Sequence, residues 1–114
     1  MQTMQAIVLT GFGGIENFEL RTVPLPHGKA ENLLVRIKAV SFNPVDYQMR
    51  QGLSEKKLLQ SPILGREFAG NVVGGNCTEY GFEKNQAVYG YAGSLGSNGT
   101  YAEYISLPAS VVAR

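Results

Sequence analysis

The residue types that most often carry out enzyme chemistry are scarce in this chain. It contains one histidine, His27, and one cysteine, Cys77, which lie 50 positions apart. A zinc ion needs three or four histidine, cysteine or carboxylate ligands, and no spacing here supplies them. A serine triad is also excluded, because the sequence has no G-x-S-x-G motif and His27 is its only possible base. We interpret His27 as a surface residue and Cys77 as an inert one.

A polar turn after an apolar stretch is the first candidate for a functional site. Asn43 is a good helix N-cap, since its side-chain oxygen can accept a hydrogen bond from an amide of the first turn. Pro44 suits the first helical position, and Asp46 places a carboxylate near the positive end of the helix dipole. The pattern predicts a short helix that ends near Gly52. On these residues alone, its first turn either faces a reaction site or only begins a helix.

Two adjacent charges, Arg66 and Glu67, stand inside the apolar stretch 63–73. Burying a charge without a partner is expensive, so we expect these residues to be either functional or paired. In the structural alternative, the carboxylate of Glu67 or Asp46 forms an ion pair. Its cation would come from Arg66 or Arg50.

The glycine-rich segments do not match a dinucleotide-binding motif. Residues 11–16 (GFGGIE) contain the first two glycines of G-x-G-x-x-G, but Glu16 replaces the third. Gly93, Gly96 and Gly99 also miss the pattern, and neither segment precedes a long helical pattern. We interpret both segments as turns, which favour glycine.

Short strands must position these residues. Apolar runs and alternating patterns predict strands at residues 6–10, 18–23, 33–40, 63–73, 87–92 and 100–107, and a further strand or connection at 110–114. Many short strands separated by turns, with one or two short helices, predict a barrel or a sandwich.

Several strands carry finer expectations. The strand at 18–23 alternates and should bury one face, while Pro24 and Pro26 keep it from a central place in a sheet. The strand at 100–107 alternates in the same way. The glycines of 63–73 predict a kink or a bulge, and residues 74–76 a turn. In the strand at 33–40 we expect four residues to share one buried face: Leu33, Val35, Ile37 and Ala39.

Composition indicates one globular domain without a charged partner. The chain has 114 residues, of which 44% are hydrophobic and 17% charged, and its net charge is +1. Lysine and arginine are scattered, so we expect neither nucleic acid nor an anionic membrane as a partner. The N-terminus has no basic region, and its apolar run is too short for a signal peptide or a membrane span. We expect a cytoplasmic protein.

Six segments together resemble a known family. Their order is similar to that of the N-terminal, GroES-like domain of the medium-chain dehydrogenase/reductase superfamily, and most similar to its zinc-free, quinone-oxidoreductase-like branch. The resemblance covers nearly the whole chain and uses residues 4–8 (MQAIV), 34–39 (LVRIKA), 43–47 (NPVDY), 64–70 (LGREFAG), 88–90 (VYG) and 99–104 (GTYAEY).

The resemblance implies a fold and an activity. The fold would be mainly β, a partly open GroES-like barrel with one or two short helices, over residues 1–114. The activity would be hydride transfer to a quinone, an enone or a similar small carbonyl substrate. NADPH would be bound mainly by a second, Rossmann-type domain that this chain does not contain. One departure is Asn85-Gln86, which stands where the family usually has Gly-Asp.

The resemblance also implies roles for single residues. Zinc-dependent members have a cysteine ligand at the position of Asn43 and a histidine ligand at that of Arg66, so we expect no zinc. Asn43 and Asp46 are the catalytic candidates, Asn43 as a hydrogen-bond donor to the substrate carbonyl and Asp46 as an orienting residue. Asn43 and Pro44 are the candidates for contact with the cofactor.

The sequence stops at Arg114, before any βαβ unit. We expect an excised domain of a longer reductase, inactive alone and without tight NADPH binding. The alternative is a stand-alone GroES-like module for binding or oligomerisation without catalysis, and a homodimer is compatible with either.

Overall fold

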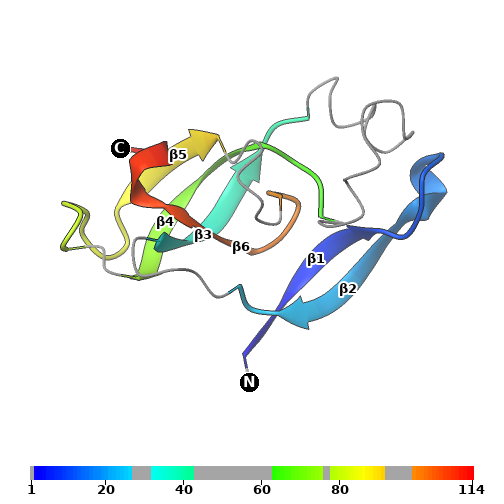
Figure 1. Cartoon of the computed structure of the whole chain (residues 1–114), viewed down its shortest axis with the longest axis horizontal. Coiled ribbons are helices and arrows are strands. Elements are labelled where there is room, and N and C mark those ends of the chain that lie inside the picture. Colours follow the sequence, from blue (N-terminus) through cyan, green and yellow to red (C-terminus); the bar gives the residue numbers. More distant parts are fainter. Residues whose placement is uncertain (1, 27–31, 43–62, 76–77, 92–98) are drawn as a thin grey trace.

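The computed structural model describes residues 2–26, 32–42, 63–75, 78–91 and 99–114. These residues form antiparallel strands in two sheets (Figure 1). The elements are β1 (Thr3–Leu9), η1 (Ile15–Asn17), β2 (Phe18–Pro24), β3 (Asn32–Val40), β4 (Glu67–Gly75), β5 (Ala87–Tyr91), β6 (Tyr104–Pro108), η3 (Ala109–Val111) and β7 (Val112–Ala113), of which η1 and η3 are 3-10 helices.

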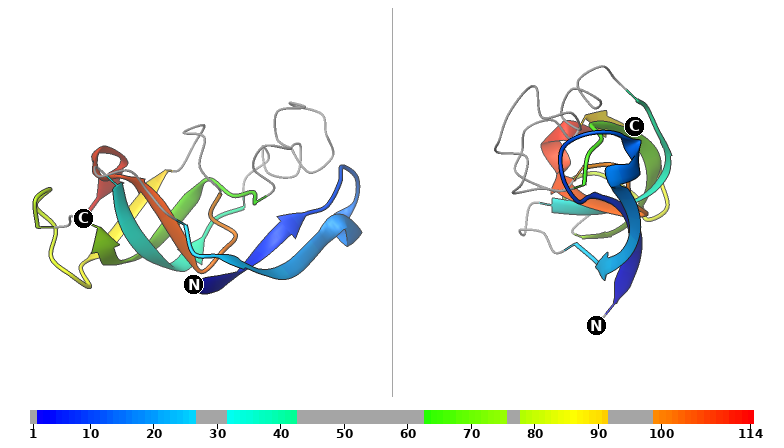
Figure 2. Two further views of the ribbon diagram at one scale, coloured as in Figure 1. Left: turned by 60° about the horizontal axis from the view of Figure 1, so that its bottom comes forward. Right: turned by 90° about the vertical axis from the view of Figure 1, so that its right-hand side faces the viewer.

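Strands β1 and β2 pair as a two-stranded ribbon, and the other strands form a sheet in the order β6-β3-β4-β5-β7. Figure 2 shows this larger sheet strongly curled, with the ribbon extending to one side. The predicted mainly β fold with short helices is confirmed. The predicted helix that begins at Pro44 lies outside the described residues.

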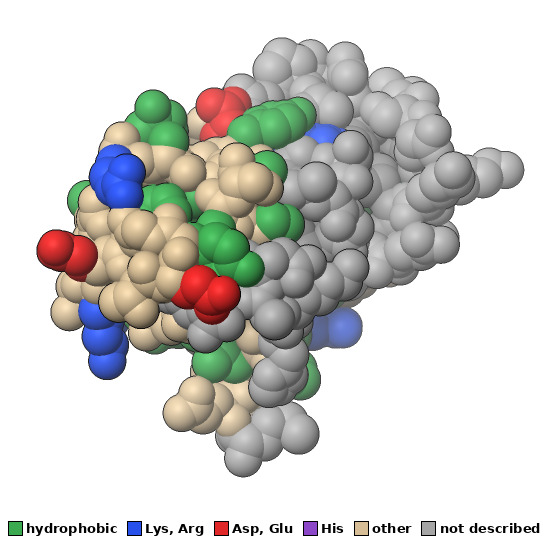
Figure 3. Space-filling view, turned by 60° about the vertical axis from the view of Figure 1, so that its left-hand side comes forward, with side chains coloured by type: hydrophobic (Ala, Val, Ile, Leu, Met, Phe, Trp, Pro, Cys, Tyr) green, Lys and Arg blue, Asp and Glu red, His purple; other side chains and the backbone are tan. Residues whose placement is uncertain are grey.

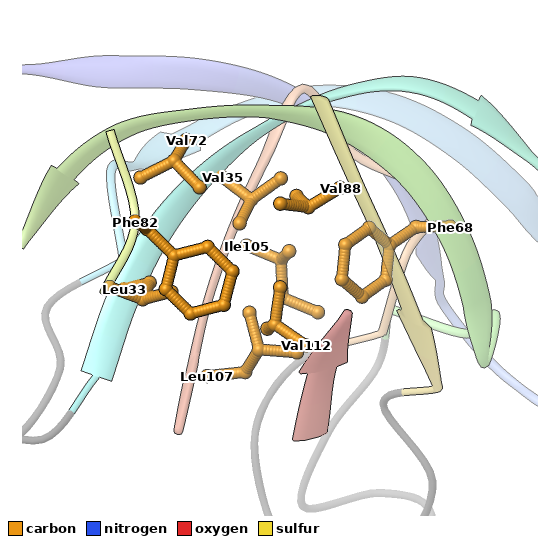
Figure 4. Packing of buried hydrophobic residues seen from close by; sticks show 9 residues of the cluster. All are labelled: Leu33, Val35, Phe68, Val72, Phe82, Val88, Ile105, Leu107 and Val112. Carbon is orange, nitrogen blue, oxygen red and sulfur yellow. The ribbon is translucent and has the colours of Figure 1, made fainter. Parts of the chain in front are cut away.

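The core fills the inside of the curled sheet. Figure 4 shows its side chains converging from strands β3, β4, β5, β6 and β7 and from the loop before β5. Burial of these apolar groups is the main favourable term for the fold. The cluster consists of Leu33, Val35, Phe68, Val72, Phe82, Val88, Ile105, Leu107 and Val112.

A second, smaller cluster fixes the ribbon. Met4, Ala6 and Val8 point from one face of β1 onto Ile63, and all four are buried. Alternate residues of a strand share a face, so β1 supplies this cluster from three successive inward positions.

The predicted single buried face of β3 is wrong at its end. Leu33 and Val35 are buried as expected, but Ala39 is exposed. The reason is an extra residue, Lys38, between the pairs Ile37↔Gly70 and Ala39↔Ala69. One inserted residue moves the following side chains to the opposite face.

This extra residue lies in β3, opposite Gly70, whereas the sequence predicted a bulge within the strand at 63–73. A second irregularity does lie in that strand, where Val73 is extra between the pairs Leu34↔Gly74 and Val35↔Val72. A Cβ on Gly70 would lie 2.0 Å from the carbonyl oxygen of Arg36, so the two backbones approach each other too closely for any side chain there. The strand itself is displaced from the predicted 63–73, because β4 begins at Glu67 and continues to Gly75. The strand ends at Gly75, whose left-handed φ of +84° is typical of a turn. The turn predicted at 74–76 is therefore supported at Gly75, while Gly74 still belongs to the strand.

The alternation predicted for two strands does not describe their burial. In β2, Leu20 is 64% exposed, because among the described strands β2 pairs with β1 alone and the second cluster covers little of it. In β6, Ile105, Ser106 and Leu107 are all buried. Ser106 can be buried because its Oγ accepts a hydrogen bond of 3.2 Å from the Asn32 side-chain amide.

Strand β5 and the C-terminal segment are close to their predicted positions. The turn before β5 has Asn85 with φ of +70°, and the Asn85 amide donates a 2.6 Å hydrogen bond to the carbonyl of Val72. Asparagine tolerates this left-handed conformation better than most residues, so it can stand where the resemblance implies a glycine.

Candidate functional site

The predicted site residues Asn43, Pro44 and Asp46 lie in the segment 43–62, outside the described residues. Their predicted roles therefore stay predictions. The structure does describe where the chain enters this segment, where it leaves it, and what surrounds both points.

The chain enters the segment at the end of β3 and leaves it before the start of β4. Val40, the last residue of β3, pairs with Phe68, the second residue of β4. Beyond it, Ser41 is half-buried and Phe42 is 60% exposed. The approach to Asn43 thus lies at the end of the sheet where β4 begins, next to an exposed aromatic ring.

Arg66 and Glu67 lie at this same end of the sheet but are not buried together. Glu67 is the first residue of β4, lies opposite Tyr91 and is exposed, so the expectation that both charges stand inside an apolar strand is wrong. Arg66 is half-buried, and its Nε atom is fully buried. Both residues take part in further interactions. The arginine is therefore the more enclosed of the two charges.

A backbone crossing holds the residue before Arg66 in place. The Thr100 amide donates a 3.2 Å hydrogen bond to the Gly65 carbonyl, and the Tyr101 amide donates one of 3.0 Å to Leu64. Gly65 has φ of +101°, and a Cβ on it would lie 2.2 Å from the Thr100 Oγ1 atom. Only glycine fits this position, since both its φ and its contacts exclude a side chain.

Thr100 is the residue that sequence reasoning missed. It is 0% exposed, and its hydroxyl makes no hydrogen bond with the residues that the structure describes. The hydroxyl occupies the space that a side chain on Gly65 would take, next to the backbone that leads into Arg66. The available signal was the segment 99–104, which we used only for its resemblance.

The same segment joins the ribbon to the larger sheet. The Gln5 amide donates a 2.6 Å hydrogen bond to the Glu103 carboxylate, and the Glu103 amide donates one of 3.1 Å to the Gln5 carbonyl. On its other side, the Glu103 carbonyl accepts a 2.8 Å bond from the Ile37 amide of β3. Tyr101 also contacts the ribbon, edge-on against Phe18 with ring centres 6.4 Å apart. Residues 99–103 therefore connect the ribbon of β1 and β2, strand β3 of the larger sheet and the segment 64–65 before β4.

The described residues of this region supply no set of zinc ligands. A guanidinium has no lone pair to offer a metal, so Arg66 cannot be a ligand. Among the described residues, no three histidine, cysteine, aspartate or glutamate side chains gather closely enough to hold a metal ion. His27 and Cys77 lie outside the part of the chain that the structure describes. What the described residues offer here is a half-buried cation, Arg66, and an exposed aromatic ring, Phe42.

The surface charges are dispersed. On the face in Figure 3, the acidic and basic side chains of the described residues are separated by hydrophobic and neutral polar ones. On the exposed ribbon, Arg21 and Glu19 form an ion pair of 3.1 Å. The hydrogen bond and the charge of Arg21 lower the pKa of Glu19, and the same contacts raise the pKa of Arg21. In the described part of the chain, no helix has the length and apolar character needed to span a membrane.

Comparison with known proteins gives a consistent result. Residues 29–114 match the alcohol dehydrogenase GroES-like domain. A zinc-type alcohol dehydrogenase-like protein of Schizosaccharomyces pombe is 33% identical over 104 residues, which cover 89% of this chain and 30% of that protein. A mitochondrial NAD(P)H oxidoreductase of Dictyostelium discoideum is 31% identical over 115 residues, which cover 96% of this chain and 32% of that protein.

A solved structure supports the same similarity. The quinone oxidoreductase from Coxiella burnetii superposes with a TM-score of 0.90 at 29% identity, over 99% of this chain and 37% of that one. The chain spans about a third of the length of the curated relatives that it matches.

Proposed function

The chain belongs to the alcohol dehydrogenase GroES-like domain family, and we propose that it forms the substrate-side domain of an oxidoreductase that reduces a quinone, an enone or a similar carbonyl. Its reductant would be NAD(P)H. Since the chain spans about a third of its relatives, the nucleotide would be held mainly by a second, Rossmann-type domain. The likeness of nearly the whole chain to a quinone oxidoreductase carries this proposal.

In this proposal, Asn43 donates a hydrogen bond to the carbonyl oxygen of the substrate. NAD(P)H, when bound, supplies the hydride, and negative charge then develops on that oxygen. A fixed donor stabilises such charge more in the transition state than in the ground state. Pro44 would contact the cofactor and Asp46 would orient the turn. The chain approaches Asn43 past the exposed ring of Phe42, which suits an apolar substrate.

The proposed reaction uses no zinc. Asn43 and Arg66 stand where the resemblance gives zinc-dependent members a cysteine and a histidine, and neither an amide nor a guanidinium replaces such a ligand. One relative is named a zinc-type protein, so the proposal needs a direct test. We expect elemental analysis of the full-length protein to find far less than one zinc per chain after dialysis without chelator. One zinc per chain, lost together with activity, would contradict the proposal.

The donor role of Asn43 is tested by substitution in the full-length protein. Removal of one such donor typically lowers kcat by about 100-fold to 1,000-fold, so we expect this loss for Asn43→Ala. Asn71→Ala is the matched control, because the Asn71 side-chain amide donates a 3.0 Å hydrogen bond to the Asn85 carbonyl, in the turn before β5 and away from the end of β4 where the chain leaves residues 43–62. If both variants reduce the same quinone at similar rates, the proposed role of Asn43 is wrong.

The 114-residue chain alone should bind NADPH weakly. It has no complete G-x-G-x-x-G motif, which in dinucleotide-binding domains lets a backbone approach the pyrophosphate. We expect calorimetric titration to find no micromolar binding and assays with quinones to find no activity. Micromolar binding by this chain would show that residues 1–114 hold the nucleotide themselves.

A further inference from the structure

Arg66 stands at the end of the larger sheet where the chain approaches Asn43. It directly precedes β4, and Val40, the last residue of β3, pairs with Phe68, two positions after Arg66. Figure 1 shows the end of β3 and the start of β4 side by side. Continued by two residues, this antiparallel register brings Phe42 opposite Arg66. A cation and an exposed aromatic ring therefore flank the approach to Asn43.

The burial of Arg66 places it on the inner side of the sheet. Phe68 points into the core, and Figure 4 shows it at one end of the buried cluster. Alternate residues of an extended chain share a face, so Arg66 lies on the side of Phe68 and the exposed Glu67 lies on the other. The Nε atom of Arg66 is fully buried, while the residue as a whole is half-buried. This cation is thus enclosed at one point and accessible elsewhere.

The backbone on both sides of Arg66 is fixed. Before it, the amides of Thr100 and Tyr101 donate hydrogen bonds to the carbonyls of residues 65 and 64. After it, Glu67 pairs with Tyr91 in the sheet. A charge on such a fixed backbone needs little reorganisation when opposite charge develops beside it, and this property distinguishes the protein groups that stabilise transition states.

We propose that Arg66 is a second hydrogen-bond donor to the substrate and places its positive charge beside the carbonyl oxygen. This inference rests on the reduction proposed above. In that reaction the nicotinamide is oxidised, a new C–H bond forms on the substrate, and the displaced π-electron pair moves onto the carbonyl oxygen. A proton from water then completes the product. A guanidinium keeps its charge at neutral pH, and its hydrogen bonds to an anionic oxygen are roughly twice as strong as those between neutral groups.

The same geometry indicates a substrate class. Phe42, opposite Arg66 in the continued register, offers an apolar ring to a flat conjugated system, while Arg66 takes the charge of its oxygen. An uncharged quinone or enone suits this pair, since conjugation carries the electron pair to the oxygen. Arg66 also interacts with other residues, but a guanidinium has several N–H donors and can keep such a partner while it binds the substrate.

A purely structural ion pair of Arg66 predicts different kinetics. Loss of a structural pair destabilises the protein or alters substrate binding, whereas a donor that acts mainly in the transition state lowers kcat and leaves KM nearly unchanged. The charge itself is tested by two substitutions. Arg66→Gln keeps hydrogen-bond donors without the charge, and Arg66→Lys keeps the charge without the planar fork.

Steady-state kinetics of the full-length protein with NADPH and menadione, a neutral quinone, provide the first test. We expect Arg66→Gln to lower kcat about 100-fold and to change KM less than about threefold. Arg66→Lys should lower kcat only about tenfold, because it keeps the charge. Arg36→Gln is the matched control, since Arg36 is exposed within β3, opposite Asn71, and it should change kcat less than about twofold. Circular dichroism checks that each variant is folded.

The outcomes separate this inference from the proposed function. A parent protein that reduces neither a quinone nor an enone would overturn the proposed function, and the role of Arg66 with it. An active parent whose Arg66→Gln variant is equally fast would overturn the role of Arg66 alone. Equal losses in Arg66→Gln and Arg66→Lys would exclude the charge as the cause.

Binding of p-nitrophenol tests the charge without turnover, because its colour shows whether its oxygen carries a proton. At a pH where half of the free compound is ionised, the full-length parent should bind it mainly as the anion, in competition with menadione. In Arg66→Gln the ionised fraction of the bound compound should fall to that in free solution or below, while Arg36→Gln should match the parent. An unchanged fraction in Arg66→Gln, or a parent that does not bind the anion, would overturn the proposed contact.

Discussion

Replacing Thr100 by valine should stabilise the protein, although Thr100 is among its most buried residues. Valine keeps the β-branched shape and replaces the hydroxyl by a methyl group. The hydroxyl is fully buried and makes no hydrogen bond in the described part of the chain, so folding removes it from water without compensation. Such a group costs about 1–3 kcal/mol.

The net gain is smaller than this cost because the site is tight. The Thr100 Oγ1 atom lies 2.2 Å from the place where a Cβ on Gly65 would be, so it is pressed against the Gly65 backbone. A methyl group is larger than a hydroxyl, and overpacking of this kind costs about 1 kcal/mol. We therefore expect Thr100→Val to raise the free energy of unfolding by about 1 kcal/mol, and the Tm by roughly 4–8 °C.

Urea denaturation of three variants separates the hydroxyl from the methyl group. Thr100→Ser keeps the hydroxyl, loses a buried methyl and should be destabilised by about 1 kcal/mol. Ser106→Ala should also be destabilised by about 1 kcal/mol, because the Ser106 hydroxyl accepts a bond from Asn32. If Thr100→Val is less stable than the parent, the hydroxyl has a partner, such as a buried water, and the reasoning is refuted.

Three further outcomes follow from the same structure. Gly65→Ala should lower the free energy of unfolding by about 3 kcal/mol, because the new side chain adopts a left-handed φ and also collides with Thr100. Gly81→Ala is the control and should lower it by about 1 kcal/mol, since Gly81 has a similar φ of +82° but its nearest side-chain atom would be 3.2 Å away. Equal losses in urea denaturation would contradict the role of the contact between Gly65 and Thr100. Glu103→Ala should speed hydrogen exchange of the β1 amide that bonds its carboxylate, which NMR measures, and an unchanged rate would exclude that bond. The pKa of Glu19 is lowered in the folded state, so its small contribution to stability is present above the unfolded-state pKa and is lost as the pH falls through the folded-state pKa. In Arg21→Gln, NMR titration should show the pKa of Glu19 return toward its normal value. An unchanged pKa would exclude the ion pair.

Local patterns in the sequence predicted most strands but not which faces they bury. The run from Leu33 onward predicts β3 because its apolar and charged residues alternate. The change of face at Ala39 depends on how β3 pairs with a strand some thirty positions later, and no local pattern contains that register. Exposure of Leu20 has a similar cause, since burial of a strand depends on what covers it.

The site was predictable only where its chemistry is local. Asn43, Pro44 and Asp46 have a helix-start pattern that one short segment displays, and their roles stay predictions. The crossing of Gly65 and Thr100 joins residues 35 positions apart. It is recognised from the collision that a side chain on Gly65 would make with Thr100, which only coordinates reveal. A glycine next to a charged residue suggests a special backbone, but it does not identify the partner.

The connection made by residues 99–103 has a consequence for the order of events during synthesis. The ribbon of β1 and β2 is local and can pair as soon as it leaves the ribosome. Its anchor to the rest of the domain, the bonds between Gln5 and Glu103, requires nearly the whole chain. The apolar face formed by Met4, Ala6 and Val8, which packs with Ile63, Tyr101 and Ala102, is therefore covered completely only after residue 102 has left the ribosome, and until then part of it is open to water and to other chains.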